Sequence, residues 1–361
     1  MRSLFLASAA AALVAVAPAA AAPHGRESPA PASPAVVPGP TGKVQPALPR
    51  LQGPAAAARP GSQFATPAIA STLRQDDARV AAVAYRLALA GKSLCPDSYP
   101  LTGMLLHHLP EYGPEERRLI RAQTPVDRGP GVLTVIEGSP AAQAGLVAGD
   151  VLLSVNGRSF PSPLAMAAEP KRKKWRLKVE ATEKQLEAEL RRGPAELRVL
   201  RDGRETATVL GSVPGCVGRV RLARSKQTNA FSLRGYVVMT TSMLRYVRSD
   251  DELAVVLGHE LAHSILGHEG MRDEEGLFAG LGIKPSNVWR REEQADRFGL
   301  RLLAAAGFDL DSAIPFWHRY LGDYDWFPQI FRSHPSRGAR AKIAREEIAA
   351  IRREAAVRSG S

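Results

Sequence analysis

The stretch His259-Glu260-Leu261-Ala262-His263 decides how this sequence is interpreted. Histidines four positions apart lie on one face of a helix, so both imidazoles can reach the same metal ion. Glu260 is placed between them to act on a water molecule in the open position of that metal. The stretch therefore predicts a metal-binding helix with an acid beside the ion.

The residues around this stretch favour a buried helix. Ser249 followed by Glu252 forms a capping-box pattern, which predicts that the helix begins there. The body that follows is mostly apolar, with Leu253, Ala254, Val255, Val256, Leu257, Leu261, Ile265 and Leu266. Polar side chains inside such a helix need partners, and a bound cation supplies them. The alternative is two core histidines bonded to backbone groups, with Glu260 at the surface.

A third metal ligand must come from elsewhere, because catalytic zinc sites usually combine three protein ligands with one open position. One class of zinc protease places a glycine and then a third histidine shortly after the pair, but Leu266 and Glu269 stand at those positions here. The other common ligand is a glutamate from a later helix. In the helical stretch that opens at Arg290, we assign Glu292 as the third ligand, with Glu293 as the fallback.

Asp296 follows Glu292 by four positions and shares its face of the predicted helix. We expect Asp296 to hydrogen-bond a ligand histidine and so to fix which ring nitrogen carries the proton. The alternative is a solvated acidic face at the start of a helix, where acidic side chains are favoured in any case.

Several segments together resemble one known family: Asn229-Ala230-Phe231, Gly235 to Thr241, Asp251 to Ala254 leading into His259-Glu260-Leu261-Ala262-His263, Glu292 with Asp296, Ala304 to Asp309, and Ser333-His334-Pro335 with Arg340. The combination resembles zinc peptidases of the CAAX prenyl protease and HtpX type, metallopeptidase family 48, and above all their soluble periplasmic members. The resemblance covers roughly residues 225–350. One departure lies at Phe231 to Gly235, where relatives more often have a Pro-Gly turn.

The resemblance implies a mainly helical, zincin-type metallopeptidase domain with a small edge sheet. It implies one zinc ion per chain, bound by the two histidines and Glu292. The strand with Asn229 and Ala230 would offer backbone groups to an extended peptide substrate. His334 and Arg340 would face the metal cleft, where they would stabilise the oxyanion, hold the substrate backbone, or place His334 on the zinc as a plug. The alternative for His334 is a surface loop before a proline turn.

A second resemblance covers residues 128–213. The segments that carry it are Gly129-Pro130-Gly131-Val132, Gly138-Ser139-Pro140-Ala141, Ala144-Gly145-Leu146, Gly149-Asp150-Val151-Leu152 and Val155-Asn156-Gly157. They closely resemble a bacterial PDZ domain, which implies a β-barrel or sandwich module inserted into the peptidase. Ser139-Pro140 predicts the start of a short helix, and Asn156-Gly157 predicts a hairpin.

The groove of a PDZ domain captures peptide termini or extended segments. We expect it between the strand at residues 132–136 and the helical stretch from Thr182. The basic run at residues 171–176 is predicted to be a loop in the module, solvated or in contact with an anionic lipid or nucleic acid. The alternative for the whole module is a packing spacer.

The start of the chain is typical of an export signal. Arg2 supplies a positive charge, residues 4–17 form an apolar core, and the alanines at 19–22 suit a cleavage site. Residues 23–68 are rich in proline and alanine, which predicts a flexible linker. The chain is therefore predicted to be exported to the periplasm, with secretion or tethering by an uncleaved signal as alternatives. Cys95 and Cys216 flank the PDZ-like segment, so a disulfide or two buried free thiols are possible.

The formal net charge of +12 favours weak association with acidic surfaces such as anionic membranes. No nucleic-acid partner is expected, since the basic residues are not interleaved with aromatic ones. His268 and His318 are interpreted as structural or surface residues. His107 and His108 are adjacent and point apart in a regular element, which disfavours a shared metal.

These observations predict an α+β protein with an N-terminal helical part of the peptidase domain at residues 69–127, the PDZ domain at 128–213 and the catalytic domain at 214–361. We interpret it as an exported zinc endopeptidase that hydrolyses misfolded or envelope proteins, with the PDZ domain selecting substrates. The alternative is a PDZ-based binding protein or chaperone with a closed zinc site, in which His334 is a fourth ligand.

Overall fold

The computed structural model describes residues 68–233, 235–268, 286–320 and 336–359. The predicted signal at 1–22, all but the last residue of the predicted linker, and His334 lie outside these ranges. Within the described ranges, no helix is both long enough and apolar enough to cross a lipid bilayer.

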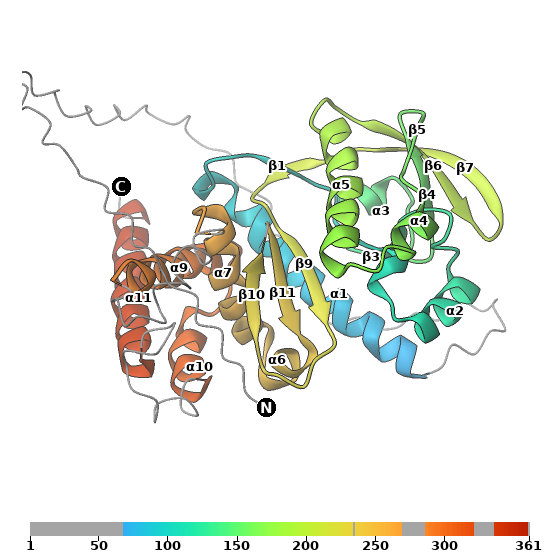
Figure 1. Ribbon diagram of the computed structural model, residues 1–361. Helices are drawn as coiled ribbons and strands as arrows, with labels where there is room; N and C mark the ends of the chain where they lie inside the picture. Colours follow the sequence, from blue (N-terminus) through green and yellow to red (C-terminus); the bar gives the residue numbers. More distant parts are fainter. Residues whose placement is uncertain (1–67, 234, 269–285, 321–335, 360–361) are drawn as a thin grey trace, which may run out of the picture. The chain divides into compact units, whose positions relative to one another are not determined.

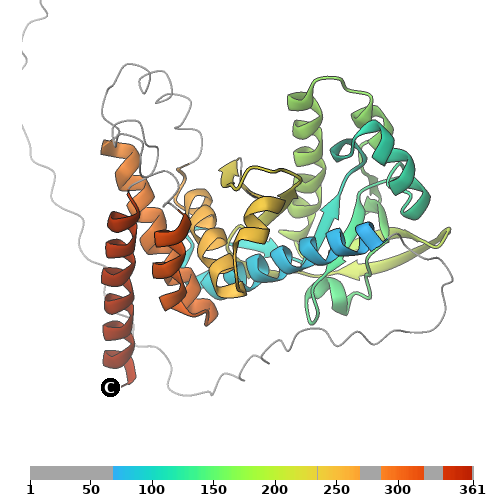
Figure 2. The same cartoon turned by 90° about the horizontal axis from the view of Figure 1, so that it is seen from below.

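Most of the helices belong to one layered group: α1 (Ala68–Ala90), α6 (Thr241–Tyr246), α7 (Asp250–Ile265), α9 (Ser286–Ala306), α10 (Ala313–Tyr320) and α11 (Arg337–Ser359), with the 3-10 turns η1 (Gly91–Leu94) and η3 (Leu310–Ser312). α7 packs on α9, and α11 packs on α9 and α10 (Figure 1). α1 packs on α7 and α9 and also reaches strands of the PDZ-like part, so it runs along both parts of the chain (Figure 2). Of the N-terminal helical part expected at residues 69–127, α1 is helical up to Ala90 and strands follow it.

α7 forms as the sequence predicts. The Ser249 hydroxyl accepts a hydrogen bond from the backbone N–H of Glu252 at 3.2 Å, which caps the first turn. The Glu252 carboxylate accepts from the N–H of Arg248 rather than from that of Ser249, so the box is displaced by one residue. Every residue from Glu252 to His263 is buried, as expected for a helix surrounded by other elements.

α7 and α9 approach each other most closely at two glycines. A Cβ atom built on Gly299 would lie 3.0 Å from the backbone of Gly258 and of His259. A Cβ atom on Gly258 would in turn meet the backbone oxygen of Gly299 at 3.2 Å. The two backbones can pack at this distance because neither residue carries a side chain.

A three-stranded sheet lies against these helices, in the order β10 (Ala230–Leu233), β11 (Tyr236–Thr240) and β9 (Arg219–Ala223). β11 pairs antiparallel with β10 and parallel with β9. Val237 and Met239 of β11 belong to the same buried cluster as Leu253 and Leu257 of α7. β10 is therefore an edge strand next to α7, as the sequence predicts.

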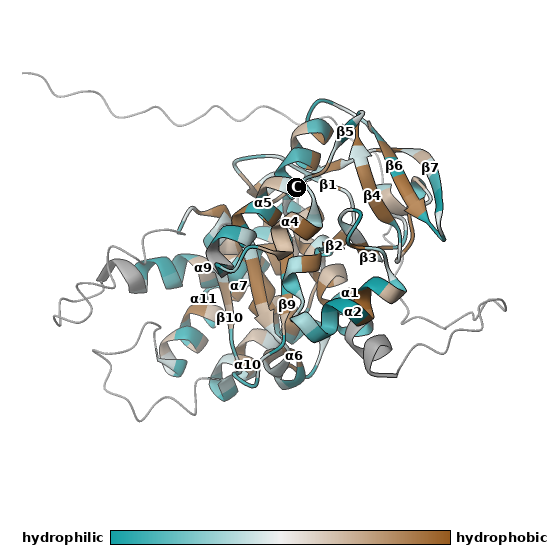
Figure 3. Ribbon diagram, turned by 45° about the vertical axis from the view of Figure 1, so that its right-hand side comes forward, coloured by the Kyte–Doolittle hydropathy of each residue, from teal (hydrophilic) through white to brown (hydrophobic). Residues whose placement is uncertain are grey.

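The PDZ-like part is built on a six-stranded antiparallel sheet made of β2 (Met104–His107), β3 (Gly131–Val135), β4 (Val151–Val155), β5 (Arg158–Ser159), β6 (Ala195–Arg201) and β7 (Arg204–Leu210). Its helices are α2 (Pro114–Gln123), α3 (Pro140–Gln143), α4 (Pro163–Ala167) and α5 (Arg172–Leu190), with the turn η2 (Leu109–Glu111). β4 and β6 are mostly hydrophobic, whereas the edge strand β7 is hydrophilic (Figure 3). The described strands follow the open order β2-β3-β4-β6-β7, with β5 on β4, and form no closed barrel.

Two predicted turns of this domain are confirmed. Asn156 and Gly157 join β4 to β5 with positive φ angles of 46° and 74°. Such angles suit the tight hairpin turn that these two residues favour. Ser139 caps α3 by accepting a hydrogen bond from the N–H of Ala142, and Pro140 occupies the first helical position.

Three expectations about this domain need correction. β2 pairs with β3, so the sheet takes a strand from before residue 128. β2 covers one edge of β3 from Gly131 to Val135, and β4 covers the other only near Gly131, so β2 rather than residues 132–136 is the strand at the outer edge. The edge that faces α5 belongs to β2, which carries residues lining the same cavity as α5. The basic run at 171–176 is not a loop, because α5 already begins at Arg172.

The PDZ-like part leaves and rejoins the helical part of the chain at one place. β1 (Tyr99–Leu101) pairs antiparallel with β8 (Val213–Gly215), and these strands form the two stems of the insertion. Cys95 and Cys216 form a disulfide beside this ladder, with their Cα atoms 5.6 Å apart. Of the two states left open by the sequence, the structure therefore has the disulfide.

Candidate metal centre

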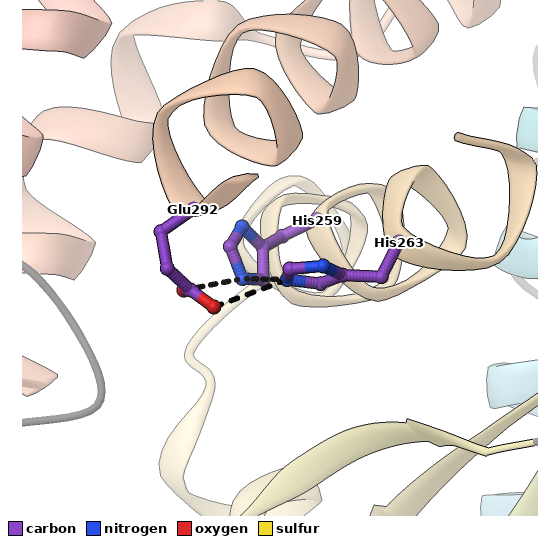
Figure 4. Close-up of side chains that lie close together, drawn as sticks. All are labelled: His259, His263 and Glu292. Atoms are coloured by element: carbon purple, nitrogen blue, oxygen red, sulfur yellow. Dashed lines mark hydrogen bonds and ion pairs between the residues drawn. The ribbon is translucent and has the colours of Figure 1, made fainter. Parts of the chain in front are cut away.

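Three buried side chains from two helices converge on one point (Figure 4). His259 and His263 lie one turn apart on α7, and Glu292 reaches them from α9. The His259 Nε2 atom is 3.2 Å from His263 Nε2. Each of these nitrogens is 3.4 Å from an oxygen of Glu292. All three residues are at most 5% exposed.

The spacing of these atoms fits a tetrahedral zinc ion. With metal–ligand bonds of about 2.0–2.2 Å, ligand atoms around zinc lie roughly 3.3 Å apart. The three separations here are 3.2, 3.4 and 3.4 Å. Two imidazoles and a carboxylate also form a donor set that suits zinc, whereas calcium and magnesium prefer oxygen ligands. Within the described part of the chain, no other group of three such side chains meets this spacing.

Asp296 and Arg340 hold His259 from behind. Asp296 Oδ1 lies 2.9 Å from His259 Nδ1, so it accepts the proton of that nitrogen when Nε2 faces the metal position. Arg340, from α11, binds both oxygens of Asp296, with its Nε atom 2.8 Å from Oδ2. The Arg340 guanidinium also stacks on Trp317 of α10, 3.4 Å from the ring centroid.

This geometry changes the role expected for Arg340. The family resemblance implied that Arg340 faces the metal cleft, but the structure buries it to 2% exposure behind His259. Its donors are used by Asp296, and its charge offsets the buried carboxylate. Arg340 is therefore a positioning residue that acts through Asp296 and His259.

The same contacts set the proton affinity of the cluster. Burial and the charge of Arg340 lower the pKa of His259, but hydrogen bonds to Asp296 and Glu292 outweigh them and raise it to about 9. Burial raises the pKa of Asp296, but Arg340 and His259 hold it below its usual value. A metal ion must therefore displace a proton from His259 near neutral pH.

His268 is a site residue that the sequence analysis missed. Gly267 ends α7 with a left-handed φ of 69°, and the N–H of His268 bonds back to the carbonyl of His263 at 2.9 Å. This turn brings His268 Nδ1 to 3.1 Å from His263 Nδ1. His268 can therefore fix the tautomer of the second ligand histidine. Gly267, two residues after the last residue of α7, is the sequence signal from which this turn could have been predicted.

The remaining predicted residues are placed as follows. Glu260 is 6% exposed and lies between the two ligand histidines on α7. Glu293, the fallback ligand, does not belong to the cluster; it is half-buried and pairs with Arg297 at 2.9 Å. Asn229 is exposed where β10 begins, and Ala230 is the first residue of that edge strand.

The other histidines of the described chain form no second metal cluster. His107 Nδ1 lies 2.7 Å from the Tyr112 hydroxyl, and His108 Nε2 lies 3.0 Å from Glu183. His318 is exposed on α10. The two adjacent histidines thus use different partners, as their spacing predicts.

Comparisons with known proteins match two families. Residues 212–284 and 277–348 match the model of peptidase family M48, and residues 131–169 match that of the PDZ domain. A putative beta-barrel assembly-enhancing protease of Vibrio cholerae is 28% identical over 161 residues, covering 35% of this chain and 33% of the relative. The mitochondrial metalloendopeptidase OMA1 of Arabidopsis thaliana is 31% identical over 143 residues, covering 32% of this chain and 28% of the relative.

The chain thus spans about a third of the length of these relatives. Among solved structures, the HtrA3 PDZ domain bound to a phage-derived ligand (FGRWV) matches 33% of this chain and 89% of that chain. It is 20% identical, with a TM-score of 0.24, so the PDZ assignment rests on the sequence match at residues 131–169.

Proposed function

Since this chain carries a peptidase family M48 domain and a PDZ domain, we propose that it is a zinc-dependent endopeptidase. The observation that carries the proposal is the spacing of the three buried donor atoms, at 3.2 to 3.4 Å from one another. Without a cation, two imidazoles and a carboxylate packed this closely would be costly to bury. Structural metal sites use four protein ligands, so three donors support a catalytic site with an open position.

When bound, a zinc ion lowers the pKa of a water molecule to about 7 and polarises a carbonyl group. In the proposed reaction, Glu260 takes the proton of that water and gives it to the leaving amine. Asp296 and Arg340 keep His259 Nε2 directed at the metal position. The free edge of β10, with Asn229 and Ala230 at its start, would hold the substrate backbone by strand addition.

Replacing Glu260 with glutamine tests this chemistry. Glu260→Gln keeps the size of the side chain but removes the proton acceptor, so casein cleavage should fall at least a hundredfold. Zinc content, measured by mass spectrometry of the metal, should stay at one ion per chain. Glu293→Gln is the matched control, because it makes the same substitution at a glutamate next to Glu292 that lies outside the metal cluster. Equal cleavage by wild type and Glu260→Gln would contradict the proposal.

The PDZ domain is proposed to select protein substrates, among them misfolded or envelope proteins. Its support is the family match and the unpaired edge of β2. Removing the insertion between the stems at β1 and β8 should change which unfolded proteins are cut, while zinc content stays the same. If wild type binds unfolded proteins but cuts none, the chain is a binding protein or chaperone. In that alternative His334 would be the fourth zinc ligand, and it lies outside the described residues.

Export to the periplasm is the proposed location. It is supported by the signal-like residues 1–22 and by the Cys95–Cys216 disulfide, since disulfides persist in oxidising compartments. N-terminal sequencing of the protein from cell fractions tests it, and a mature chain that retains Met1 in the cytoplasm would contradict it. Weak binding to anionic membranes is part of the proposal, and co-sedimentation with phosphatidylglycerol vesicles at low and high salt tests that part.

A further inference from the structure

The unpaired edge of the PDZ sheet opens on a cavity that has three walls. β2 pairs with β3 on one side, and among the described strands none pairs with its other side. Along that side runs a cavity of about 110 Å³, lined by Met104 to Leu106 of β2 and by Leu186 of α5. The third wall comes from the peptidase domain and consists of Gly218 and the first residues of β9, Arg219 to Arg221.

A larger cavity of about 460 Å³ continues between the same three elements. It shares Leu105 and Leu106 of β2 with the first cavity, and Trp175 and Val179 line it from α5. The wall from the peptidase domain includes Arg221 and the following residues of β9. The groove therefore has a wall from the peptidase part, because β9 lies opposite α5.

Two arginines of β9 hold α5 in this position. Arg219 binds Glu187 through two hydrogen bonds, at 2.7 Å from Nε and 2.5 Å from Nη2. The Tyr99 hydroxyl joins the pair, since Arg219 Nε also lies 3.0 Å from it. The side chains of Arg219 and Glu187 are 12% and 13% exposed, so solvent screens this bidentate pair only weakly.

The second contact is centred on Glu183, one turn before Glu187 on α5. Glu183 binds Arg221 of β9, the Tyr236 hydroxyl of β11 and His108 Nε2, the last at 3.0 Å. Arg221 is further held by Glu111 at 3.1 Å. All of these groups have partners while α5 is packed on β9, and separation would leave buried charges unpaired.

We propose that β9 is a gate on the PDZ groove, closed by the Arg219–Glu187 and Arg221–Glu183 ion pairs. An extended peptide reaches the edge of β2 only when α5 moves away from β9. The peptidase domain thereby controls access to the PDZ groove through its own sheet. The inference rests on the proposed function only in taking the groove as a peptide site; the gate itself involves neither zinc nor catalysis.

A buried reporter thiol tests the gate without a peptide ligand. Both cysteines of the chain are in the disulfide, so Val179→Cys introduces a single reactive group in the groove. Val179 is 5% exposed while the gate is closed, so a maleimide should label the thiol slowly. In this background, Arg219→Glu should speed labelling about tenfold or more, because it places like charges together. Adding Glu187→Arg should restore slow labelling.

Two controls separate gate opening from unfolding. A Leu197→Cys reporter lies in the PDZ core at 0% exposure and is labelled only when the domain unfolds. A charge swap of the exposed Arg198–Glu205 pair on the β6–β7 hairpin should change neither reporter. Should Arg219→Glu fail to fold, Arg219→Gln replaces it. The gate is refuted if Arg219→Glu raises the labelling rates of both reporters equally or leaves the rate of the groove reporter unchanged. It is also refuted if adding Glu187→Arg does not restore slow labelling.

Discussion

Replacing Asp296 with asparagine should weaken zinc binding through a residue that does not touch the metal position. Asp296 accepts the proton of His259 Nδ1 at 2.9 Å and is itself held by Arg340. Asparagine keeps the shape but presents no charge to either neighbour. Loss of such an outer partner typically lowers metal affinity about 10- to 100-fold, or about 1.4–2.7 kcal/mol.

The same substitution should also destabilise the metal-free protein. Asp296 and Arg340 are 5% and 2% exposed, and breaking a buried ion pair costs about 3–5 kcal/mol because one charge stays buried alone. Urea unfolding in the presence of a chelator measures this loss. Zinc affinity is then measured by chelator competition under conditions where the variant is folded. Glu293→Gln, on the same helix, is the control and should match wild type in both assays.

The affinity for zinc should increase with pH. Zinc displaces a proton from His259, whose pKa is raised to about 9, so wild-type affinity should increase as pH rises towards that value. Asp296→Asn removes one of the two hydrogen bonds that raise this pKa, and the increase should therefore end at a lower pH. Near pH 9, where the proton on His259 opposes zinc binding only weakly, the difference in zinc affinity between the two proteins reflects the lost orientation of the His259 ring. Equal affinities of the two proteins at that pH would refute the reasoning.

Three further predictions concern other contacts. His268→Ala should lower zinc affinity about tenfold by freeing the ring of His263, and unchanged competition curves would contradict this. Replacing Cys95 and Cys216 with serine should lower the free energy of unfolding by up to about 5 kcal/mol, because their disulfide closes a loop of 121 residues. Equal urea midpoints for wild type with and without reductant would argue against this. Burial raises the pKa of Glu183, but Arg221 and the other partners lower it to about 2. The charged Glu183 should therefore stabilise the fold above about pH 4.5, and this contribution should be lost as the pH falls to 2. The stability of Glu183→Gln should not show this loss.

The metal centre could be predicted from the sequence because its signals are local. The four-residue spacing of His259 and His263, and of Glu292 and Asp296, reflects the period of a helix, and the structure keeps both pairs on shared faces. His268 escaped the same logic because it stands five residues after His263. A left-handed turn at Gly267, rather than the helix period, returns it to the site.

The parts that the sequence did not reveal depend on contacts between distant segments. Nothing near Met104 indicates that β2 joins β3, because strand pairing is set by the whole sheet and not by the strand itself. Arg340 was placed in the cleft by analogy alone. Its burial against Asp296 and Trp317 depends on how α10 and α11 pack, which no local pattern encodes.

The contact between Gly258 and Gly299 bears on how the protein can evolve. A methyl group at Gly299 would press on the backbone beside His259, and α9 would have to tilt to make room. Glu292 lies two turns from Gly299 on that helix, so a tilt of α9 would displace its carboxylate from the metal position. Substitutions at Gly258 and Gly299 are thus limited by the position of the Glu292 carboxylate, although neither glycine contacts it.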